Sequence, residues 1–386
     1  MKISIPNSNS VILSGKEWLI TIVLFLVIGF GIYYGWYRWE QFNPEPDYRS
    51  TCWEERMSDY WAYGRWNRYA QAHYKILLTG DSVIWGQEVR NDETISHYLN
   101  AEFGKEKVAN LGIDGLTCAA MDGIISYYGE YIHDTNLILQ FNPLWVSSTS
   151  RDMRGDGNTG LPWFFDPKPG DMKKDWRFHH PRLVPQLSTR IHYYKNLNER
   201  LGYLFEHYSR LSPFVRHLMV DYFGNKSIAA WIMDNPYRNP ISAITFKTAP
   251  MMAEKQGLGT DWASRQKRIK LIDDPFIKLD ESVQWKGYIE TLKKLKKKNV
   301  NVFVLLGPYN TYCMTPQSRE KFFFTMSEVK KKLDSLGFPY FDSTQDLLPS
   351  AAYADQCHAL KDGHAELAKT LFQDPKFKQW VLGIKL

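Results

Sequence analysis

The stretch Thr79-Gly80-Asp81-Ser82-Val83-Ile84-Trp85-Gly86 decides the fold that the sequence predicts. It follows Lys75 and the apolar run Ile76-Leu77-Leu78, which is typical of a short buried strand. The strand would deliver Ser82 into a tight turn between two glycines. Open α/β sheets hold their functional groups at the carboxyl ends of their strands. A serine in this position can act as a nucleophile if the chain also supplies a base, an orienting acid and oxyanion donors.

Strand and helix patterns alternate outward from this turn. After the first strand at 75–78, short apolar runs predict strands at 108–111, 137–141, 300–306 and 338–342. Helical spacing of apolar residues predicts helices at about 92–103, 117–131, 285–298, 316–336 and 362–372. Such alternation indicates a parallel sheet with helices on both faces. The expected fold class is α/β, a flavodoxin-type three-layer sandwich with a five-stranded parallel sheet.

The composition is that of a globular chain. Of 386 residues, 23% are charged and 44% hydrophobic, and the length permits one large domain or two ordinary ones. A net charge of +6, with no basic arm or known nucleic-acid motif, argues against a nucleic-acid partner. Aromatic residues make up 15%, which fits either a large aromatic core or a surface that meets sugars, lipid headgroups or protein.

The cysteines leave their pairing open. The chain has four, Cys52, Cys118, Cys313 and Cys357, with neither a C-x-x-C motif nor a zinc-binding spacing. An even number permits disulfides if the domain lies outside the cytoplasm, and three pairings are possible. We therefore predict no metal site and no bound cofactor.

Residues 18–37 form a run of about 20 uncharged, mostly apolar residues, the length that crosses a bilayer as a helix. Aromatic residues mark both ends, as in interfacial belts: Trp18 at one, and Tyr33, Tyr34, Trp36 and Tyr37 at the other. A cleavable signal peptide would be shorter and would end in a small-x-small site. This run ends in bulky aromatics and has no polar face, so we favour a retained anchor over a signal peptide or a buried core helix.

The charges that flank this run predict its orientation. Lys2 and Lys16 precede it, whereas Arg38 and Glu40 follow it, so the positive-inside rule slightly favours a cytoplasmic N-terminus. The predicted organisation is a cytoplasmic tail at 1–16, a transmembrane anchor at 17–37, a juxtamembrane linker at 38–73 and one domain at 74–386. A largely helical insertion at about 144–283, with helices near 191–208 and 214–223, interrupts the domain.

A base for Ser82 is predicted near the C-terminus. The loop before the helix expected at 362–372 contains Asp355-Gln356-Cys357-His358. A carboxylate three residues before a histidine can reach the imidazole from the same loop. It would fix the tautomer and stabilise the imidazolium, leaving the other ring nitrogen to take a proton from the serine.

Four blocks, taken in order, resemble the SGNH (GDSL-type) hydrolase superfamily. They are Gly80-Asp81-Ser82-x-x-x-Gly86, Asn110-Leu111-Gly112-Ile113-Asp114-Gly115, Asn142, and Asp355-x-x-His358. Each follows a predicted strand or, for the last, precedes a predicted helix. The resemblance covers about residues 74–145 and 300–375.

The resemblance implies a role for each residue. Ser82 would be the nucleophile, His358 the base and Asp355 its orienting partner. The oxyanion hole would combine the backbone N–H groups of Ser82 and Gly115 with the side chain of Asn142. The third block departs from the family pattern Gly-x-Asn-Asp, because this chain reads Gln140-Phe141-Asn142-Pro143.

Structural alternatives stay open for these residues. Ser82 can cap a helix, Gly115 can be a plain turn glycine, and Asn142 can be a turn residue before proline. Cys118 lies close to Gly115 in sequence and Cys357 adjoins His358, so a disulfide that braces the site is a further possibility.

The function that the resemblance implies is acyl transfer through an acyl-serine. With its single anchor and large insertion, the chain is similar to SGNH-like proteins that partner a multi-spanning membrane-bound O-acyltransferase. We therefore expect a single-pass protein of the cell membrane, with its catalytic domain on the periplasmic or cell-surface side, that acylates a cell-envelope glycan or polymer. An esterase that removes such groups, and a non-catalytic binding partner, are the alternatives.

Overall fold

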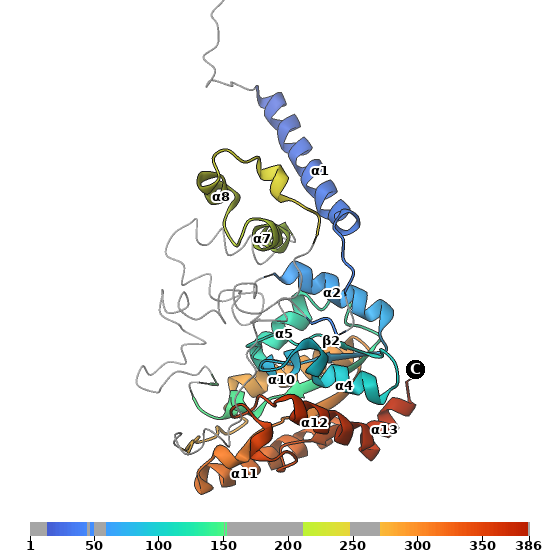
Figure 1. Cartoon of the computed structure of the whole chain (residues 1–386), viewed down its shortest axis with the longest axis vertical. Helices are drawn as coiled ribbons and strands as arrows, with labels where there is room; N and C mark the ends of the chain where they lie inside the picture. The colour runs from blue at the N-terminus through green and yellow to red at the C-terminus, as the bar shows by residue number, and fades with distance from the viewer. Residues whose placement is uncertain are drawn as a thin grey trace, which may run out of the picture.

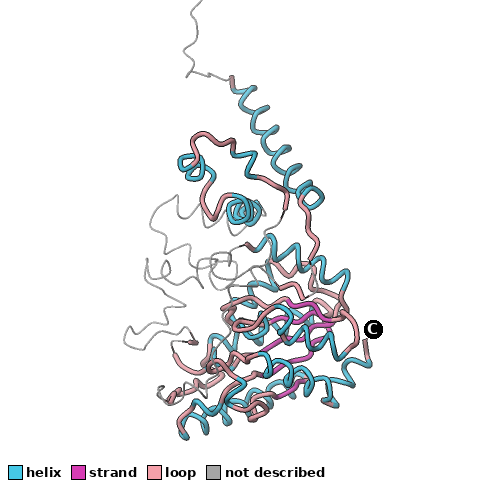
Figure 2. Tube along the Cα trace, in the orientation of Figure 1, coloured by secondary structure: helices cyan, strands magenta, loops and turns pink. Residues whose placement is uncertain are grey.

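Five parallel strands form one sheet in the order β2-β1-β3-β4-β5 (Figure 2). They are β1 (Ile76–Thr79), β2 (Val108–Asn110), β3 (Asn136–Phe141), β4 (Asn301–Leu306) and β5 (Tyr340–Asp342). The computed structural model describes residues 14–44, 47–49, 59–149, 151–152, 211–247 and 271–384 (Figure 1). The α/β fold class predicted from the sequence is confirmed, and each strand begins and ends within two residues of its predicted bounds.

Alternate side chains of the strands enter two separate cores, because both faces of the sheet are covered. On β4, Val302, Val304 and Leu306 pack on one face, and Phe303 and Leu305 on the other. The first face is covered by α2 (Tyr60–His73), α5 (Cys118–Tyr127), α10 (Val283–Lys297) and α11 (Pro316–Leu336). The second face is covered by α4 (Ile95–Glu102), α12 (Lys361–Gln373) and α13 (Pro375–Leu382).

Shorter elements complete the described part of the chain. They are α3 (Ser82–Trp85), α7 (Leu211–Tyr222), α8 (Ile228–Asp234), η2 (Asn91–Glu93), η3 (Pro143–Val146), η8 (Pro240–Ala243), η10 (Thr311–Cys313) and η11 (Ser350–Ala352). The order of the strands reverses direction between β1 and β3, and ligand sites of open sheets lie at such a switch point. The turns that carry Ser82 and Asn142 follow these two strands.

Helix α2 was not predicted, since residues 38–73 were interpreted as a linker. It begins at Asp59, whose side chain accepts the Ala62 N–H at 3.0 Å, and it is buried on most of its circumference. A helix that is buried all round shows no amphipathic stripe in its sequence. Helix α13 was also not predicted, because the last helix was expected to end near Phe372. The helix predicted at 191–208 lies outside the described residues.

Helix α1 (Gly15–Trp39), with 25 residues, is long and apolar enough to cross a membrane. A capping box at Ser14 starts it. Its apolar side chains are exposed along most of its length, whereas its last turns contact the domain. Trp36 is 4% exposed and packs edge-on against Phe214 and Tyr222 of α7, with ring centroids 5.4 and 5.9 Å away.

Buried charges join the end of α1 to α2 and α7. Glu40 contacts Arg65 and Tyr222, and it accepts a hydrogen bond from Nε2 of His217 at 2.9 Å. Nδ1 of His217 bonds Asp59 at 2.8 Å. Burial lowers the pKa of His217, but the Asp59 and Glu40 carboxylates outweigh it and raise this pKa to about 10. The imidazolium therefore stays charged at neutral pH and binds the three elements together.

Candidate active site

Ser82 is the first residue of α3, directly after the turn that ends β1. The preceding residue, Asp81, caps this helix, because its Oδ1 accepts the Val83 N–H at 3.0 Å. Ser82 is therefore not the capping residue, and its side chain is free for another partner. Only 7% of Ser82 is exposed.

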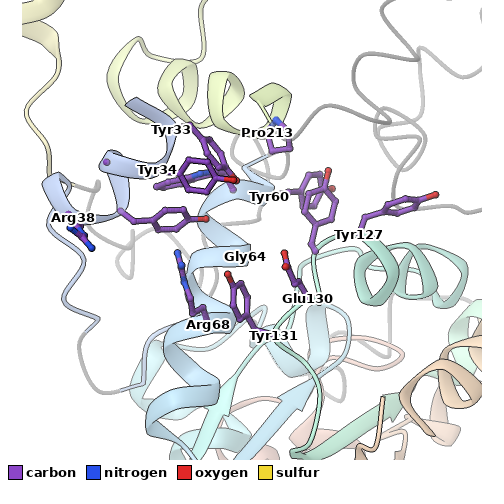
Figure 3. Close-up of a pocket in the computed structure, with 14 residues that line it drawn as sticks. Tyr33, Tyr34, Arg38, Tyr60, Gly64, Arg68, Tyr127, Glu130, Tyr131 and Pro213 are labelled. Atoms are coloured by element: carbon purple, nitrogen blue, oxygen red, sulfur yellow. The ribbon is translucent and has the colours of Figure 1, made fainter. Parts of the chain in front are cut away.

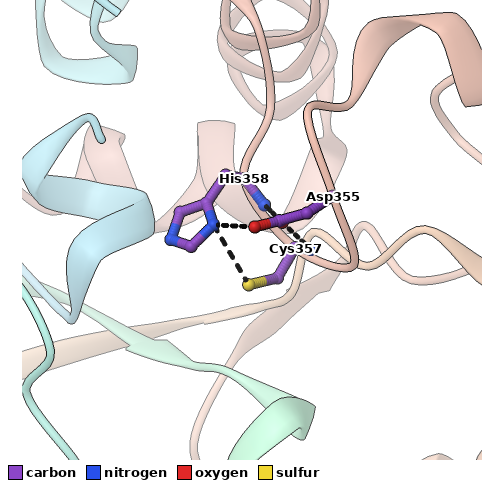
Figure 4. A group of neighbouring side chains, drawn as sticks. All are labelled: Asp355, Cys357 and His358. Atoms are coloured by element: carbon purple, nitrogen blue, oxygen red, sulfur yellow. Dashed lines mark hydrogen bonds and ion pairs between the residues drawn. The ribbon is translucent and has the colours of Figure 1, made fainter. Parts of the chain in front are cut away.

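Ser82, His358 and Asp355 form a continuous chain of hydrogen bonds. Oγ of Ser82 lies 2.7 Å from Nε2 of His358, and Nδ1 of His358 lies 2.7 Å from Oδ2 of Asp355. Figure 4 shows the Asp355 carboxylate and the Cys357 sulfur on the same side of the His358 ring, where both approach Nδ1, the sulfur at 3.9 Å. The structure thus brings together the three residues that the sequence predicts as nucleophile, base and orienting acid, although they are up to 276 residues apart in sequence.

A tight turn fixes the geometry of the acid and the base. The N–H groups of Cys357 and His358 both donate to Oδ1 of Asp355 at 2.9 Å, so the carboxylate is held by its own loop. Asn310, in the loop after β4, supports this turn from outside. Its backbone N–H donates to the Gln356 carbonyl at 2.8 Å, and its side chain donates to the Asp355 carbonyl at 3.1 Å.

The electrostatics favour an ionised Asp355. Burial opposes its ionisation, but the hydrogen bonds from the side chain and backbone of His358 outweigh burial and lower its pKa to about 2. Its contribution to folding stability is therefore present above about pH 4 and is lost as the pH falls toward 2. Because the Asp355 side chain is about half exposed, solvent screens part of this contribution.

The pairing with Asp355 also affects the pKa of His358. Burial lowers its pKa, but the contacts with Cys357 and Asp355 raise it well above 6.5. Burial also raises the pKa of the Cys357 thiol, which stays neutral at physiological pH. We therefore attribute the stabilised imidazolium to the Asp355 carboxylate. The pairing stabilises the fold below about pH 6.5, and this contribution is lost as the pH rises through the pKa of His358.

The loop after β2 lies directly against α3. A Cβ at Gly112 would be 2.4 Å from the Trp85 backbone nitrogen, so no other residue fits there without movement. The Asn110 side chain donates to the Ile84 carbonyl at 2.8 Å. The second sequence block therefore supports the helix that begins with the serine.

Near this contact, the backbone N–H groups of Ser82 and Gly115 remain available to a ligand, whereas those of two neighbouring residues do not. The Gly112 N–H donates to the side chain of Asn110, at the end of β2, at 2.9 Å, and the Ile113 N–H donates to the Gly80 carbonyl at 3.1 Å. The N–H groups of Gly115 and Ser82 donate to none of the residues that the structure describes. Gly115 has φ +66°, a left-handed conformation that favours glycine, so it is also a turn glycine. Free donors at these two positions are what an oxyanion hole requires.

Asn142 has two structural partners. Its Oδ1 accepts the Leu144 N–H at 3.0 Å and caps η3, and its Nδ2 donates to Oδ2 of Asp81 at 2.8 Å. The Trp145 indole N–H donates to the same Asp81 oxygen at 2.8 Å. Asn142 is thus both a turn residue, as the alternative interpretation held, and a neighbour of the serine turn. The second hydrogen on its amide nitrogen takes part in neither of these bonds and can be donated to a ligand.

Gln140, two residues before Asn142, also contacts the turn that carries Ser82. Its Oε1 accepts the Asp81 N–H at 3.1 Å, and its Nε2 donates to the Gly307 carbonyl at 3.2 Å. The glutamine therefore links the serine turn to the end of β4. The contacts of Gln140 and Trp145 were missed from the sequence, because no residue pattern distinguishes them from ordinary core side chains.

The cysteines are not paired in the described part of the chain. Cys118, Cys313 and Cys357 are free and buried, so the disulfide considered between Cys118 and Cys357 is not formed. Cys52 lies outside the described residues.

Two groups have the spacing of metal donors, and the chemistry of neither favours a metal. In the first, Asp355, Cys357 and His358, the thiol is held neutral by burial, and His358 already shares its Nδ1 with Asp355. In the second, formed by Glu40, His217 and Asp221, both imidazole nitrogens bond carboxylates. The contacts of the first group are therefore those of a histidine hydrogen-bonded to a serine and a carboxylate.

A comparison with models of protein families found no match. A search of curated proteins found no match either.

The pairing of His358 with Asp355 predicts a measurable titration. In the Asp355→Asn variant the pKa of His358 should fall, because the Asp355 carboxylate no longer opposes the effect of burial. Histidine-labelled protein followed by NMR gives this pKa directly. The matched variant Cys357→Ser should leave it nearly unchanged. Equal shifts in the two variants would contradict the assignment of Asp355 as the charge partner.

Proposed function

We propose that this chain is a membrane-anchored serine acyltransferase of the SGNH type, acting outside the cytoplasm on a cell-envelope glycan or polymer. The observation that carries the proposal is the hydrogen-bonded chain from Ser82 through His358 to Asp355. Both of its links measure 2.7 Å, which is within the reach needed for proton transfer. The sequence blocks that resemble the SGNH superfamily supply the same residues.

The geometry supports a two-stage reaction. Oγ of Ser82 attacks the carbonyl carbon of an acyl ester while Nε2 of His358 takes its proton. The oxygen of the departing alcohol then receives that proton as its bond to the carbonyl carbon breaks, which leaves an acyl-serine. In the second stage Nε2 of His358 removes a proton from an acceptor hydroxyl, whose oxygen attacks the acyl carbon. The bond from that carbon to Oγ of Ser82 then breaks, and Oγ takes the proton back from His358. Asp355 holds Nδ1–H throughout and stabilises the imidazolium.

The negative oxygen of each tetrahedral intermediate needs donors. The N–H groups of Ser82 and Gly115, together with an amide hydrogen of Asn142, are the groups that we assign to this role. Each is fixed before the substrate arrives, because α3, the turn at Gly115 and the cap of η3 hold them in place. Preorganised donors of this kind typically contribute about 100- to 1000-fold each to turnover.

The anchor supports a transferase on a surface polymer. The buried Trp36 is part of the domain's packing, so cleavage after α1 would remove a core side chain. This favours a retained anchor over a signal peptide. A domain held at the bilayer is suited to receive an acyl group from a multi-spanning O-acyltransferase and to pass it to a polymer hydroxyl. The same site would act as an esterase if water took the place of that hydroxyl.

Nucleophilic character at Ser82 can be measured without knowing the substrate. A fluorophosphonate probe should label the full chain at Ser82, and labelling should fall by at least about 1000-fold in Ser82→Ala or His358→Ala. Ser335→Ala, on the exposed face of α11, is the control and should label like the wild type. Wild-type protein that stays folded and unlabelled would contradict the catalytic role and favour a binding partner.

The choice between transferase and esterase rests on the acceptor. In a bilayer mimetic, the full chain should consume an aryl acyl ester faster when a glycan acceptor is added, and the acyl group should appear on the glycan by mass spectrometry. Ser82→Ala should abolish both. Rapid consumption that no acceptor changes, with free acid as the product, would assign an esterase instead.

The role proposed for the Asn142 amide can be tested with Trp145 as the matched control position. Asn142→Ala should lower turnover by about 100- to 1000-fold, because it removes a proposed oxyanion donor. Trp145→Phe removes the other side-chain donor to Oδ2 of Asp81 and leaves the amide in place, so it should cost much less. The ratio of kcat values for these two variants measures the role of the amide. Equal losses would mean that Asn142 acts only by holding Asp81.

A further inference from the structure

A cavity of about 510 Å³ opens at the junction of α1 with the domain, and Ser82 is not among the residues that line it. It lies between the last turns of α1, the first turns of α2 and the segment that ends α5 (Figure 3). Helix α5 starts near the turn that carries Ser82 and runs antiparallel to the strands. Its end therefore lies near the amino ends of the strands, away from Ser82. Cavities of this size hold small ligands or headgroups.

The position of the cavity relative to a bilayer follows from α1. The exposed apolar side chains of this helix extend from Trp18 to Tyr34, and at 1.5 Å per residue this length is about that of the hydrocarbon core. Tyr33, Tyr34 and Arg38 line the cavity at the end of that stretch. If α1 spans the membrane, as the proposed function has it, the cavity lies at the level of the lipid headgroups.

The walls carry charge of both signs. Arg68 lies over the ring of Tyr37, 3.8 Å from its centroid, and 5.2 Å from that of Tyr131. Neither Arg68 nor Arg38 forms an ion pair or hydrogen bond with any residue that the structure describes. Glu130 lines the same cavity, and in Figure 3 it lies across the cavity from Arg38, with Arg68 between them.

We propose that this cavity binds the headgroup of a zwitterionic phospholipid, such as phosphatidylethanolamine. Its phosphate would lie against Arg38 and Arg68, which supply charge-assisted hydrogen bonds. Its ammonium would lie near Glu130 and the tyrosine rings, which attract cations through their π faces. The acyl chains would run along the exposed apolar surface of α1. The bound lipid would fill the space between the end of α1 and the domain.

The proposal is tested with the full chain in detergent, by native mass spectrometry. Equal amounts of phosphatidylethanolamine, phosphatidylglycerol and diacylglycerol are supplied. We expect one phosphatidylethanolamine to be retained, with at least about tenfold preference over diacylglycerol. The double variant R38Q/R68Q should lose at least about tenfold in retention. Glu130→Gln should reduce the preference for phosphatidylethanolamine over phosphatidylglycerol.

The control is Arg238→Gln. This arginine stacks on Trp231, 6.0 Å from its centroid, outside the cavity, and its loss should not change lipid retention. Should R38Q/R68Q fail to fold, the R38K/R68K variant keeps both charges and loses the planar guanidinium fork, and it should retain less phosphatidylethanolamine than the wild type. Ser82→Ala should retain lipid like the wild type, so this result is separable from that of the catalytic proposal.

Three results would overturn the inference. One is equal retention of diacylglycerol, which has no phosphate. Another is tighter binding of phosphatidylglycerol than of phosphatidylethanolamine, which would exclude a zwitterionic site. The third is displacement of the lipid by inorganic phosphate at equal concentration, which would mean that the ligand is a free anion.

Discussion

A carboxylate enclosed in protein must be paired with donors, and Asp81 meets that requirement at the centre of the candidate site. It is 2% exposed, and burial raises its pKa against the opposing effect of its hydrogen bonds. Those bonds come from the backbone of Val83, the amide of Asn142 and the indole of Trp145. Removing the partner of a buried charge typically lowers folding stability by about 3–5 kcal/mol. One side chain therefore fixes the turn of the nucleophile and the amide that faces it.

The sequence predicted those parts of the molecule that local patterns encode. Apolar runs located the strands, because alternate strand residues enter the two cores. The turn at Ser82 and the Asp355-x-x-His358 loop were also found, since turn chemistry and short spacing are local features. Their meeting across 276 residues rested on the expected sheet order, in which strand ends gather at one edge.

Other features could not be predicted because they depend on tertiary contacts. Helix α2 has no apolar stripe, and its buried Arg65 is tolerated only because Glu40 lies opposite. The bonds of Gln140 to Asp81 and Gly307 are visible only once β3 lies between β1 and β4. The role of Trp145 could not be predicted either, because nothing in the sequence indicates that the N–H of a buried tryptophan donates to a carboxylate.

The buried junction of Trp36, Glu40 and His217 has a mechanical consequence. A flexible tether lets a domain sample a broad range of heights and tilts, and its active site is then spread over a volume. Here the anchor continues into the domain's own packing, so rotation of one part carries the other with it. For a protein held in a bilayer, Ser82 would then sweep a thin shell parallel to the membrane at one distance from it. Selection among acceptor hydroxyls would depend on their height above the lipid as well as on their chemistry.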